Sequence, residues 1–307
     1  MKRREFLHIA APTAAALALP CMTFAAADEK QPAGRFTLWQ LPPQTHSQNM
    51  CYVLRSDAGR LIVIDGGTSG DAGYLRGFLA ALGNRVDAWF ISHAHDDHYD
   101  AVTAILKKPG KLEIDKFYGS LPEDEWIKKN EPQSLGRAVA FNRAVKDSGH
   151  RVSELRLGQV LHVDGIRIEI LGVKNPEITP NAINNSSVVM RVSDRDKKVL
   201  FTGDLGVQGG RKLMKTPYAK QLTADYVQMA HHGQNGTDEN FYKAVGAKQC
   251  LWPTPRWLWD NNSGKGKGSG PWKTLEVRAW MEKMGVAKNY VSADGLFQIG
   301  AKDLIQQ

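Results

Sequence analysis

The chain has 307 residues, enough for one large domain or two small ones. Hydrophobic residues make up 42% and charged residues 23%, the balance of a soluble globular protein with a sizeable core. No stretch after residue 30 reaches the roughly 18–20 apolar residues that a membrane helix needs, which argues against a membrane span. The formal net charge of +8 favours anionic partners without fixing a site.

Residues 1–27 are expected to be a signal peptide that precedes a single domain at 28–307. Residues 3–7 read Arg-Arg-Glu-Phe-Leu, which resembles a twin-arginine export signal, and a weakly apolar run follows. A disordered basic tail is the alternative, and Pro20 before Cys21 fits a lipoprotein site poorly, so cleavage is expected after Ala27. Removing three positive and one negative charge lowers the net charge to +6. We expect a periplasmic or secreted bacterial protein, a partner of the twin-arginine machinery, with no membrane span after cleavage.

Strands and helices alternate along the rest of the chain, as judged from β-branched and aromatic runs and from turn residues. In the first half, the predicted strands are 35–41, 49–55, 60–65, 86–92 and 116–119, and the predicted helices are 72–82, 99–107 and 134–148. In the second half, the predicted strands are 152–157, 160–163, 167–171, 187–193, 198–202, 226–230, 248–253, 289–292 and 296–299, and the predicted helices are 209–222, 239–245 and 274–284. This order predicts an α/β fold of two mixed sheets packed face to face, with helices outside.

Two cysteines remain after residue 27, and both lie in predicted strands. An oxidising periplasm would permit a bridge between Cys51 and Cys250. Their positions favour two buried free thiols instead.

A run of histidines and aspartates directly follows the predicted strand at 86–92. It reads His93-Ala94-His95-Asp96-Asp97-His98. On a turn, His-x-His can direct two imidazoles at one cation, and the Asp-His pair that follows can serve a second cation. Imidazole nitrogen and carboxylate oxygen are the usual protein ligands of Zn²⁺. The run therefore predicts metal binding rather than a chance group of surface histidines. Asp96 is interpreted as a solvated loop residue, with a role in the site as the alternative.

Ser92-His93-Ala94-His95-Asp96-Asp97-His98 resembles the first metal motif of the metallo-β-lactamase superfamily. Three further motifs resemble that family and occur in its order: Asp65-Gly66-Gly67, Phe201-Thr202-Gly203-Asp204 and Ala230-His231-His232-Gly233. The resemblance implies the four-layer αββα sandwich of this family and a metal-dependent hydrolase. It also implies that Asp204 bridges two metals and that the last motif supplies a histidine to the second.

One histidine of the common family pattern is missing between the first motif and Asp204. His150 and His162 lie too early to replace it, and the corresponding place reads Asn184-Asn185-Ser186-Ser187. This segment, together with His-His-Gly, resembles the metallo-β-lactamase-like domain of ComEC-type competence proteins, which is linked to nucleic-acid degradation during DNA uptake. A similar arrangement occurs in exported phosphocholine esterases.

Two divalent cations are expected, of unequal affinity. His93, His95 and Asp204 give the first metal three firm ligands. Asn184 or Asn185 could add a weak amide oxygen or leave a place for water. The second metal would take four ligands and bind more tightly: Asp97, His98, Asp204 and His232. Zn²⁺ is favoured, with Mn²⁺ or Fe as alternatives. The doublet alone does not say which of its histidines is the ligand, but resemblance to the phosphoesterases favours His232.

Roles beyond metal binding are expected for Asp65, Asp97 and His231. Asp65 is expected to orient a ligand histidine or the loop beneath it, since ligating imidazoles usually donate their other N–H to a carboxylate or carbonyl. Two cations sharing Asp204 would lower the pKa of a water molecule and generate hydroxide. Asp97 could also take a proton. His231, predicted to face the substrate, could stabilise a phosphoryl oxygen or protonate a leaving group, and a supporting hydrogen-bonding role is the alternative.

Three functions remain open. A phosphoesterase or phosphodiesterase, acting on a small molecule or on nucleic acid, is favoured. A hydrolase of lactones, thioesters or β-lactams is the second, and a weakly catalytic metal-containing binding protein is the third. Trp252, Trp257 and Trp259 are interpreted as a cap on the core. The alternative is that these aromatic residues, beside Arg256, stack bases or form a cation-binding wall. The natural substrate, the physiological metal and the oligomeric state are not set by the sequence.

Overall fold

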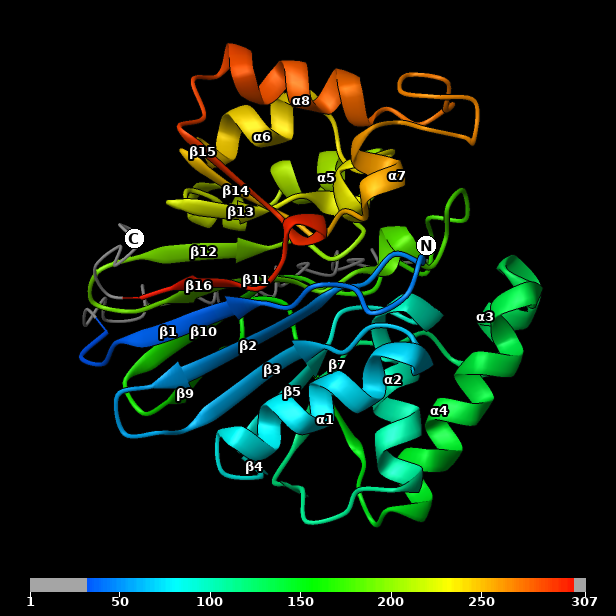
Figure 1. Cartoon of the computed structure of the whole chain (residues 1–307), viewed down its shortest axis with the longest axis vertical. Helices are drawn as coiled ribbons and strands as arrows, with labels where there is room; N and C mark the ends of the chain where they lie inside the picture. Colours follow the sequence, from blue (N-terminus) through cyan, green and yellow to red (C-terminus); the bar gives the residue numbers. More distant parts are fainter. Residues whose placement is uncertain (1–31, 301–307) are drawn as a thin grey trace, which may run out of the picture. The chain divides into compact units, whose positions relative to one another are not determined.

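The computed structural model describes residues 32–300, so the predicted signal peptide lies outside the described residues. Two seven-stranded sheets dominate this part of the chain (Figure 1). Within residues 32–300, no helix has both the length and the apolar character required to cross a membrane.

The first sheet is antiparallel at one edge and parallel at the other. Its strands lie in the order β16 (Phe297–Ile299), β1 (Phe36–Gln40), β2 (Cys51–Ser56), β3 (Leu61–Asp65), β5 (Ala88–Ile91), β7 (Phe117–Gly119) and β8 (Val152–Glu154). A small parallel pair stands apart from it, formed by β4 (Arg85–Val86) and β6 (Glu113–Ile114).

The second sheet is likewise mixed. Its strands lie in the order β15 (Lys288–Val291), β14 (Gln249–Trp252), β13 (Tyr226–Gln228), β12 (Lys198–Phe201), β11 (Val189–Ser193), β10 (Ile166–Gly172) and β9 (Val160–Val163). The run from β12 to β15 is parallel, so the chain leaves each of these strands at the same edge of the sheet.

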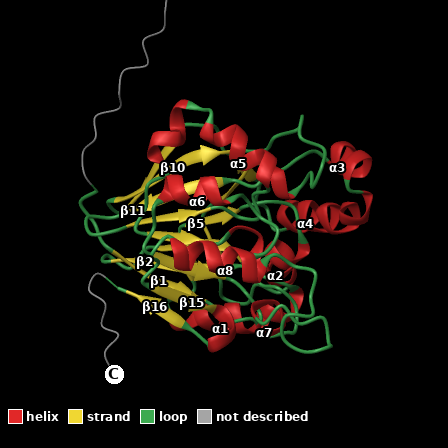
Figure 2. Cartoon of the chain, turned by 90° about the horizontal axis from the view of Figure 1, so that it is seen from above, coloured by secondary structure: helices red, strands yellow, loops and turns green. Residues whose placement is uncertain are grey.

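Helices cover the outer face of each sheet, which completes four layers (Figures 1 and 2). On the first sheet these are α1 (Ala72–Ala81), α2 (Asp96–Lys107), α3 (Asp124–Asn130) and α4 (Leu135–Asp147). On the second they are α5 (Val207–Met214), α6 (Glu239–Val245), α7 (Arg256–Trp259) and α8 (Thr274–Lys283). The predicted αββα sandwich is confirmed.

The alternation of side chains along the strands explains this layering. In β3, Ile62 and Ile64 pack in the core between the sheets, while Leu61 and Val63 pack beneath the helices. Successive side chains of a strand point to opposite faces, so a strand buried on both faces needs a continuous apolar run. Leu-Ile-Val-Ile meets that requirement, and every residue of β3 is buried.

Several predicted boundaries were wrong. Helix α2 begins at Asp96 rather than at 99, so half of the histidine run lies on its first turn. The helix predicted at 209–222 ends at Met214, and a separate 3-10 turn begins at Pro217, whose ring and missing N–H do not fit a continuing helix. The short helices α3 and α7 were not predicted.

Candidate metal centre

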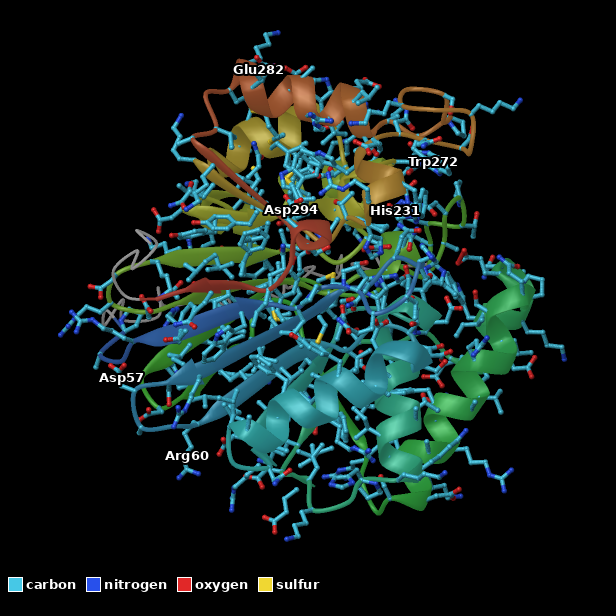
Figure 3. All side chains as sticks on the ribbon, in the orientation of Figure 1. Asp57, Arg60, His231, Trp272, Glu282 and Asp294 are labelled. Carbon is cyan, nitrogen blue, oxygen red and sulfur yellow. The ribbon has the colours of Figure 1, made fainter. Side chains whose placement is uncertain are left out.

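The predicted site residues follow the carboxyl ends of strands in both sheets. Asp65 ends β3, His93 follows β5 and Asp204 follows β12. His231 and His232 follow β13 within a 3-10 turn, Ala230–Gly233. Figure 3 shows His231 on the side toward which β12 points, while Asp57 and Arg60, in the β2–β3 turn, lie on the opposite side. The two sheets thus bring together residues that are far apart in sequence.

Three side chains form the first donor group: His93, His95 and Asp204. The Nε2 atom of His93 lies 3.1 Å from Nδ1 of His95 and 3.8 Å from Oδ2 of Asp204. His93 is completely buried, whereas the side chain of His95 is 21% exposed. The group therefore sits at the edge of the buried cluster.

The second donor group consists of Asp97, His98 and His232, again with Asp204 beside it. The Nε2 atom of His232 lies 3.0 Å from Oδ2 of Asp97 and 3.5 Å from Oδ2 of Asp204. The Nε2 atom of His98 lies 3.3 Å from Oδ1 of Asp204. Asp204 thus reaches both groups, as the bridging role requires.

These residues fit divalent cations. His98 Nε2, His232 Nε2 and Asp204 Oδ1 are buried. They lie at ion-pair distances from neighbouring donor-group atoms but make no hydrogen bond of good geometry, a costly arrangement unless a ligand satisfies them. Ligands about 2.0–2.1 Å from a tetrahedral Zn²⁺ lie roughly 3.3 Å from one another, close to the donor separations observed here. The second group with Asp204 offers four donors, whereas the first offers three.

Local backbone structure directs the donors of the histidine run. His95 has extended torsions and caps α2, which places Asp97 and His98 in the first helical turn. Acidic residues are favoured there by the helix dipole. Asp96, in the same turn, is exposed, in agreement with its predicted solvation.

The histidine doublet adopts an unusual backbone conformation. His231 has φ 51° and His232 has φ 53°, in the left-handed region that side chains with a Cβ rarely adopt. The next residue, Gly233, also has positive φ, and a Cβ there would lie 2.3 Å from the ring of Trp252. Such strain persists only where the surroundings enforce it, and here it turns both imidazoles toward Asp204.

The two histidines of the doublet differ in environment. His232 is fully buried and its Nδ1 pairs with the carbonyl of Pro253 at 2.8 Å, which leaves Nε2 for the cluster. His231 is 21% exposed, and its Nε2 lies 3.9 Å from Asp204. His232 therefore directs Nε2 to the second donor group, whereas His231 lies at the partly exposed edge of the cluster.

Asp65 supports the cluster from beneath. Its Oδ2 lies 2.8 Å from Nδ1 of His98 and accepts the Ser92 hydroxyl at 2.7 Å, while its Oδ1 accepts the Ser92 N–H at 2.8 Å. The Ser92 hydroxyl also lies 3.0 Å from Nδ1 of His93. Both buried histidines are therefore held at Nδ1, with Nε2 left toward the donor groups.

The buried charges shift the pKa values of the cluster. Burial and the neighbouring His98 hold the pKa of His93 well below its usual value. Burial acts in the same direction on His232, but Asp204 and Asp97 outweigh it and raise its pKa to about 9. The pKa of each carboxyl of Asp97 and Asp204 is lowered, because the adjacent histidines outweigh the effect of burial. A cation would replace the extra proton that the raised pKa of His232 otherwise keeps on this side chain.

The Asn-Asn-Ser-Ser segment has mainly a structural role. Asn185 turns away from the donor groups: its Oδ1 accepts the N–H of Gly209 in α5 at 2.8 Å, so it is not positioned as a metal ligand. The Ser187 hydroxyl accepts the N–H of Asp204 at 3.0 Å and so fixes the bridging residue. Only Asn184 faces the site, with Nδ2 3.4 Å from Nε2 of His231 and a buried, unpaired Oδ1.

Sequence reasoning missed Ser92, Ser187 and Glu131 as partners of the site. Ser92 stands in the recognised motif and could have been found there. Ser187 was noted as the start of a predicted strand and as part of the Asn-Asn-Ser-Ser segment, but no role was assigned to it. Glu131 lies 3.7 Å from Nε2 of His95. No sequence pattern points to it, because it comes from the end of α3 in a different part of the chain.

The tryptophan cluster divides between core and surface. Trp252 is fully buried, and Trp259 packs edge-on against it at 5.2 Å, as expected for a cap on the core. Trp257 instead donates to the carbonyl of His46 at 2.7 Å and lies 4.8 Å from the ring of Trp272. Figure 3 labels Trp272 on the same side of the molecule as His231.

The cysteine prediction agrees with the structure. Cys51 and Cys250 are buried and free. They lie on β2 and β14, in different layers of the core.

The comparison with family models agrees with the order of the motifs and with the sandwich. Residues 45–239 match the model described as metallo-beta-lactamase superfamily. The chain belongs to this superfamily. The expectation of a metal-dependent hydrolase is confirmed at that level, with the two donor groups as the place where metal ions can bind.

Solved structures agree on the fold. The metallo-beta-lactamase fold protein YhfI from Bacillus subtilis is similar with a TM-score of 0.54 and 15% identity, over 86% of this chain and 100% of that chain. Unliganded yeast PDE1 has a TM-score of 0.51 and 11% identity, over 87% and 99% of the two chains. No curated protein matches the sequence. At these identities the likeness concerns the fold alone.

Proposed function

We propose that this superfamily member is an exported metal-dependent hydrolase of phosphoester or phosphodiester bonds, acting on a small molecule or on nucleic acid. The observation that carries the proposal is the pair His231 and Asn184 at the partly exposed edge of the cluster, beside the donor group with fewer ligands. An incomplete first group leaves coordination positions for substrate oxygens. The net charge of +6 beyond residue 27 favours an anionic substrate.

The first donor group, the second donor group and the shared Asp204 are proposed to hold two divalent cations, Zn²⁺ or alternatively Mn²⁺ or Fe. When bound, such cations supply activation of a water molecule and neutralisation of the charge that develops on the phosphoryl group. The second group, with four donors counting Asp204, is proposed to bind the tighter cation.

His231 is proposed to handle a proton at its Nε2 atom. Asn184 Nδ2 lies 3.4 Å from this atom and Nδ1 lies 3.3 Å from the carbonyl of Asn235, an arrangement that places the imidazole proton on Nδ1. Burial lowers the pKa of His231, so its Nε2 is free to accept a proton at neutral pH. Once protonated, it can donate to a phosphoryl or leaving-group oxygen. Asp97 is proposed to accept a proton in addition to binding metal.

The resemblance to ComEC-type domains supports nucleic acid as one substrate class. It rests on Asn184 to Ser187 and on the His-His-Gly turn. Asn184 contacts His231, and the Ser187 hydroxyl accepts the N–H of Asp204. These contacts put two residues of the segment beside the donor groups.

Export by the twin-arginine route remains part of the proposal. N-terminal sequencing of protein from a bacterial periplasm should find cleavage after Ala27. Replacing Arg3 and Arg4 by lysine should leave the protein unprocessed in the cytoplasm. Processing that continues unchanged in this variant would refute the twin-arginine route without affecting the hydrolase assignment.

The experiment that tests the activity is a substrate screen of metal-analysed protein. Bis-p-nitrophenyl phosphate and p-nitrophenyl phosphocholine should be hydrolysed, and nitrocefin should not. The Asp204→Ala variant should lose metal and turnover together. Hydrolysis of nitrocefin or of a lactone alone would favour a carbonyl hydrolase, and no turnover at full metal loading would favour a binding protein.

A further inference from the structure

Glu131 stands at the edge of the first donor group although its place in the chain is distant from all the motifs. It follows α3 and precedes Pro132, and a residue before proline is disfavoured in helical conformation. The helix therefore ends at Asn130, and Glu131 adopts φ −147° and ψ 65°. Its side chain is 15% exposed, and Oε1 lies 3.7 Å from Nε2 of His95.

His95 is oriented differently from the other histidines of the donor groups. His93 and His98 have Nδ1 beside Ser92 or Asp65, and His232 has Nδ1 against the carbonyl of Pro253, so each turns Nε2 to the donor groups. In His95, Nδ1 lies 3.1 Å from Nε2 of His93, and Nε2 is turned to Glu131. His95 thus offers Nδ1 to the first group, and its proton belongs on Nε2.

We propose that Glu131 is a positioning residue for the first cation. Its carboxylate holds the proton of His95 on Nε2, fixes the ring, and leaves the lone pair of Nδ1 for the metal. Carboxylate partners of this kind orient ligating imidazoles and make them more basic donors. The inference rests on the metal binding of the proposed function and not on the identity of the substrate.

The same carboxylate connects the first group to the asparagine segment. Glu131 Oε2 accepts the N–H of Ile183 at 2.8 Å, and Ile183 directly precedes Asn184. One side chain therefore lies at ion-pair distance from His95 and accepts a hydrogen bond from the turn that stands where the common family pattern has a further histidine. With three firm donors, the first group depends on correct placement of each, so loss of this support should weaken the looser cation selectively.

The test compares Glu131→Gln with the wild type and with Glu125→Gln, a control within α3, the helix that Glu131 follows, whose carboxylate is exposed. Glu131 directs one carboxylate oxygen to Nε2 of His95 and the other to the N–H of Ile183. The glutamine side chain has one oxygen, so it cannot keep both contacts. Stepwise zinc affinities are measured by competition with a chromogenic chelator. We expect the looser equivalent to weaken by about 10- to 100-fold in Glu131→Gln, with the tighter equivalent and the control unchanged. Unchanged affinity of the looser equivalent, or equal weakening of both, would overturn the proposal.

A second measurement needs neither activity nor a variant. Long-range ¹H–¹⁵N correlation spectra of the zinc-treated wild type report which nitrogen of His95 is protonated. We expect Nε2–H, and a proton on Nδ1 would overturn the role of Glu131. If the wild type holds one zinc equivalent rather than two, the two-cation proposal fails and the positioning role of Glu131 fails with it. Two equivalents with the proton of His95 on Nδ1 would overturn the role of Glu131 alone.

Discussion

Replacing Asp65 by Asn tests how far one buried carboxylate controls the second donor group. Asp65 is fully buried and contacts the Ser92 N–H, the Ser92 hydroxyl and Nδ1 of His98 at 2.7–2.8 Å. Asparagine can keep its oxygen on the Ser92 N–H, but it then turns an NH₂ group toward His98. His98 would respond by placing its proton on Nε2, the atom that the cation needs.

The magnitude follows from these contacts. Loss of a carboxylate partner of a ligating histidine typically weakens metal binding about 10- to 100-fold. That factor corresponds to about 1.4–2.7 kcal/mol of binding free energy. The free energy of unfolding of the metal-free protein should also fall by about 1–3 kcal/mol, because a buried polar group loses its partner.

The matched control is Asp87→Asn. Asp87 precedes β5, at the end opposite His93, and its carboxylate accepts the N–H of Leu61 at 2.8 Å and a bond from Arg60 at 2.9 Å. Chelator competition gives the zinc affinities, and urea unfolding gives the stabilities. The Asp87→Asn control should have a lower free energy of unfolding and unchanged zinc affinities. If Asp65→Asn also loses stability while the tighter zinc affinity stays at the wild-type value, Asp65 is only a structural residue and the reasoning is refuted.

Four further outcomes are expected. His231→Asn should lower turnover by about 10²- to 10⁴-fold with zinc content unchanged, and loss of zinc would show instead that it is a ligand. Asn185→Ala should lower the free energy of unfolding, measured in urea, by about 1–3 kcal/mol, because it removes the acceptor for an N–H of α5. A change in zinc affinity without a loss of stability would contradict this expectation. Removing metal with a chelator should lower the melting temperature, and added zinc should restore it, since a cation present at 100 times its Kd stabilises the folded protein by about 2.7 kcal/mol. An equal melting temperature with and without metal would argue against both sites. Burial raises the pKa of the thiols of Cys51 and Cys250, to about 12 for Cys250, so in a Cys21→Ser background neither should react with maleimide at pH 8 before unfolding. Because the unfolded thiols lose their protons near about pH 8.5, this contribution to stability is present below that pH and is lost as the pH rises toward 12, which urea titrations at increasing pH can check.

Local chemistry explains why much of the site could be predicted from the sequence. His93, His95, Asp97 and His98 lie within one short run, and its spacing alone indicates metal ligands. Asp65 was assigned an orienting role because ligating imidazoles need a partner, and the contact with His98 is present. The helix boundary within the run was missed, because the start of α2 depends on His95 taking extended torsions as its cap.

The sequence by itself determined the layers of the fold and the identity of most donor residues, since strand alternation and motif spacing are properties of neighbouring residues. The tertiary structure alone decided their orientation. In the folded protein, Asn185 contacts α5 instead of the donor groups, Ser187 accepts the N–H of Asp204, and Glu131 lies beside His95. These contacts depend on which buried polar groups need a partner once the two sheets have packed. The spacing of residues along the chain therefore cannot predict them.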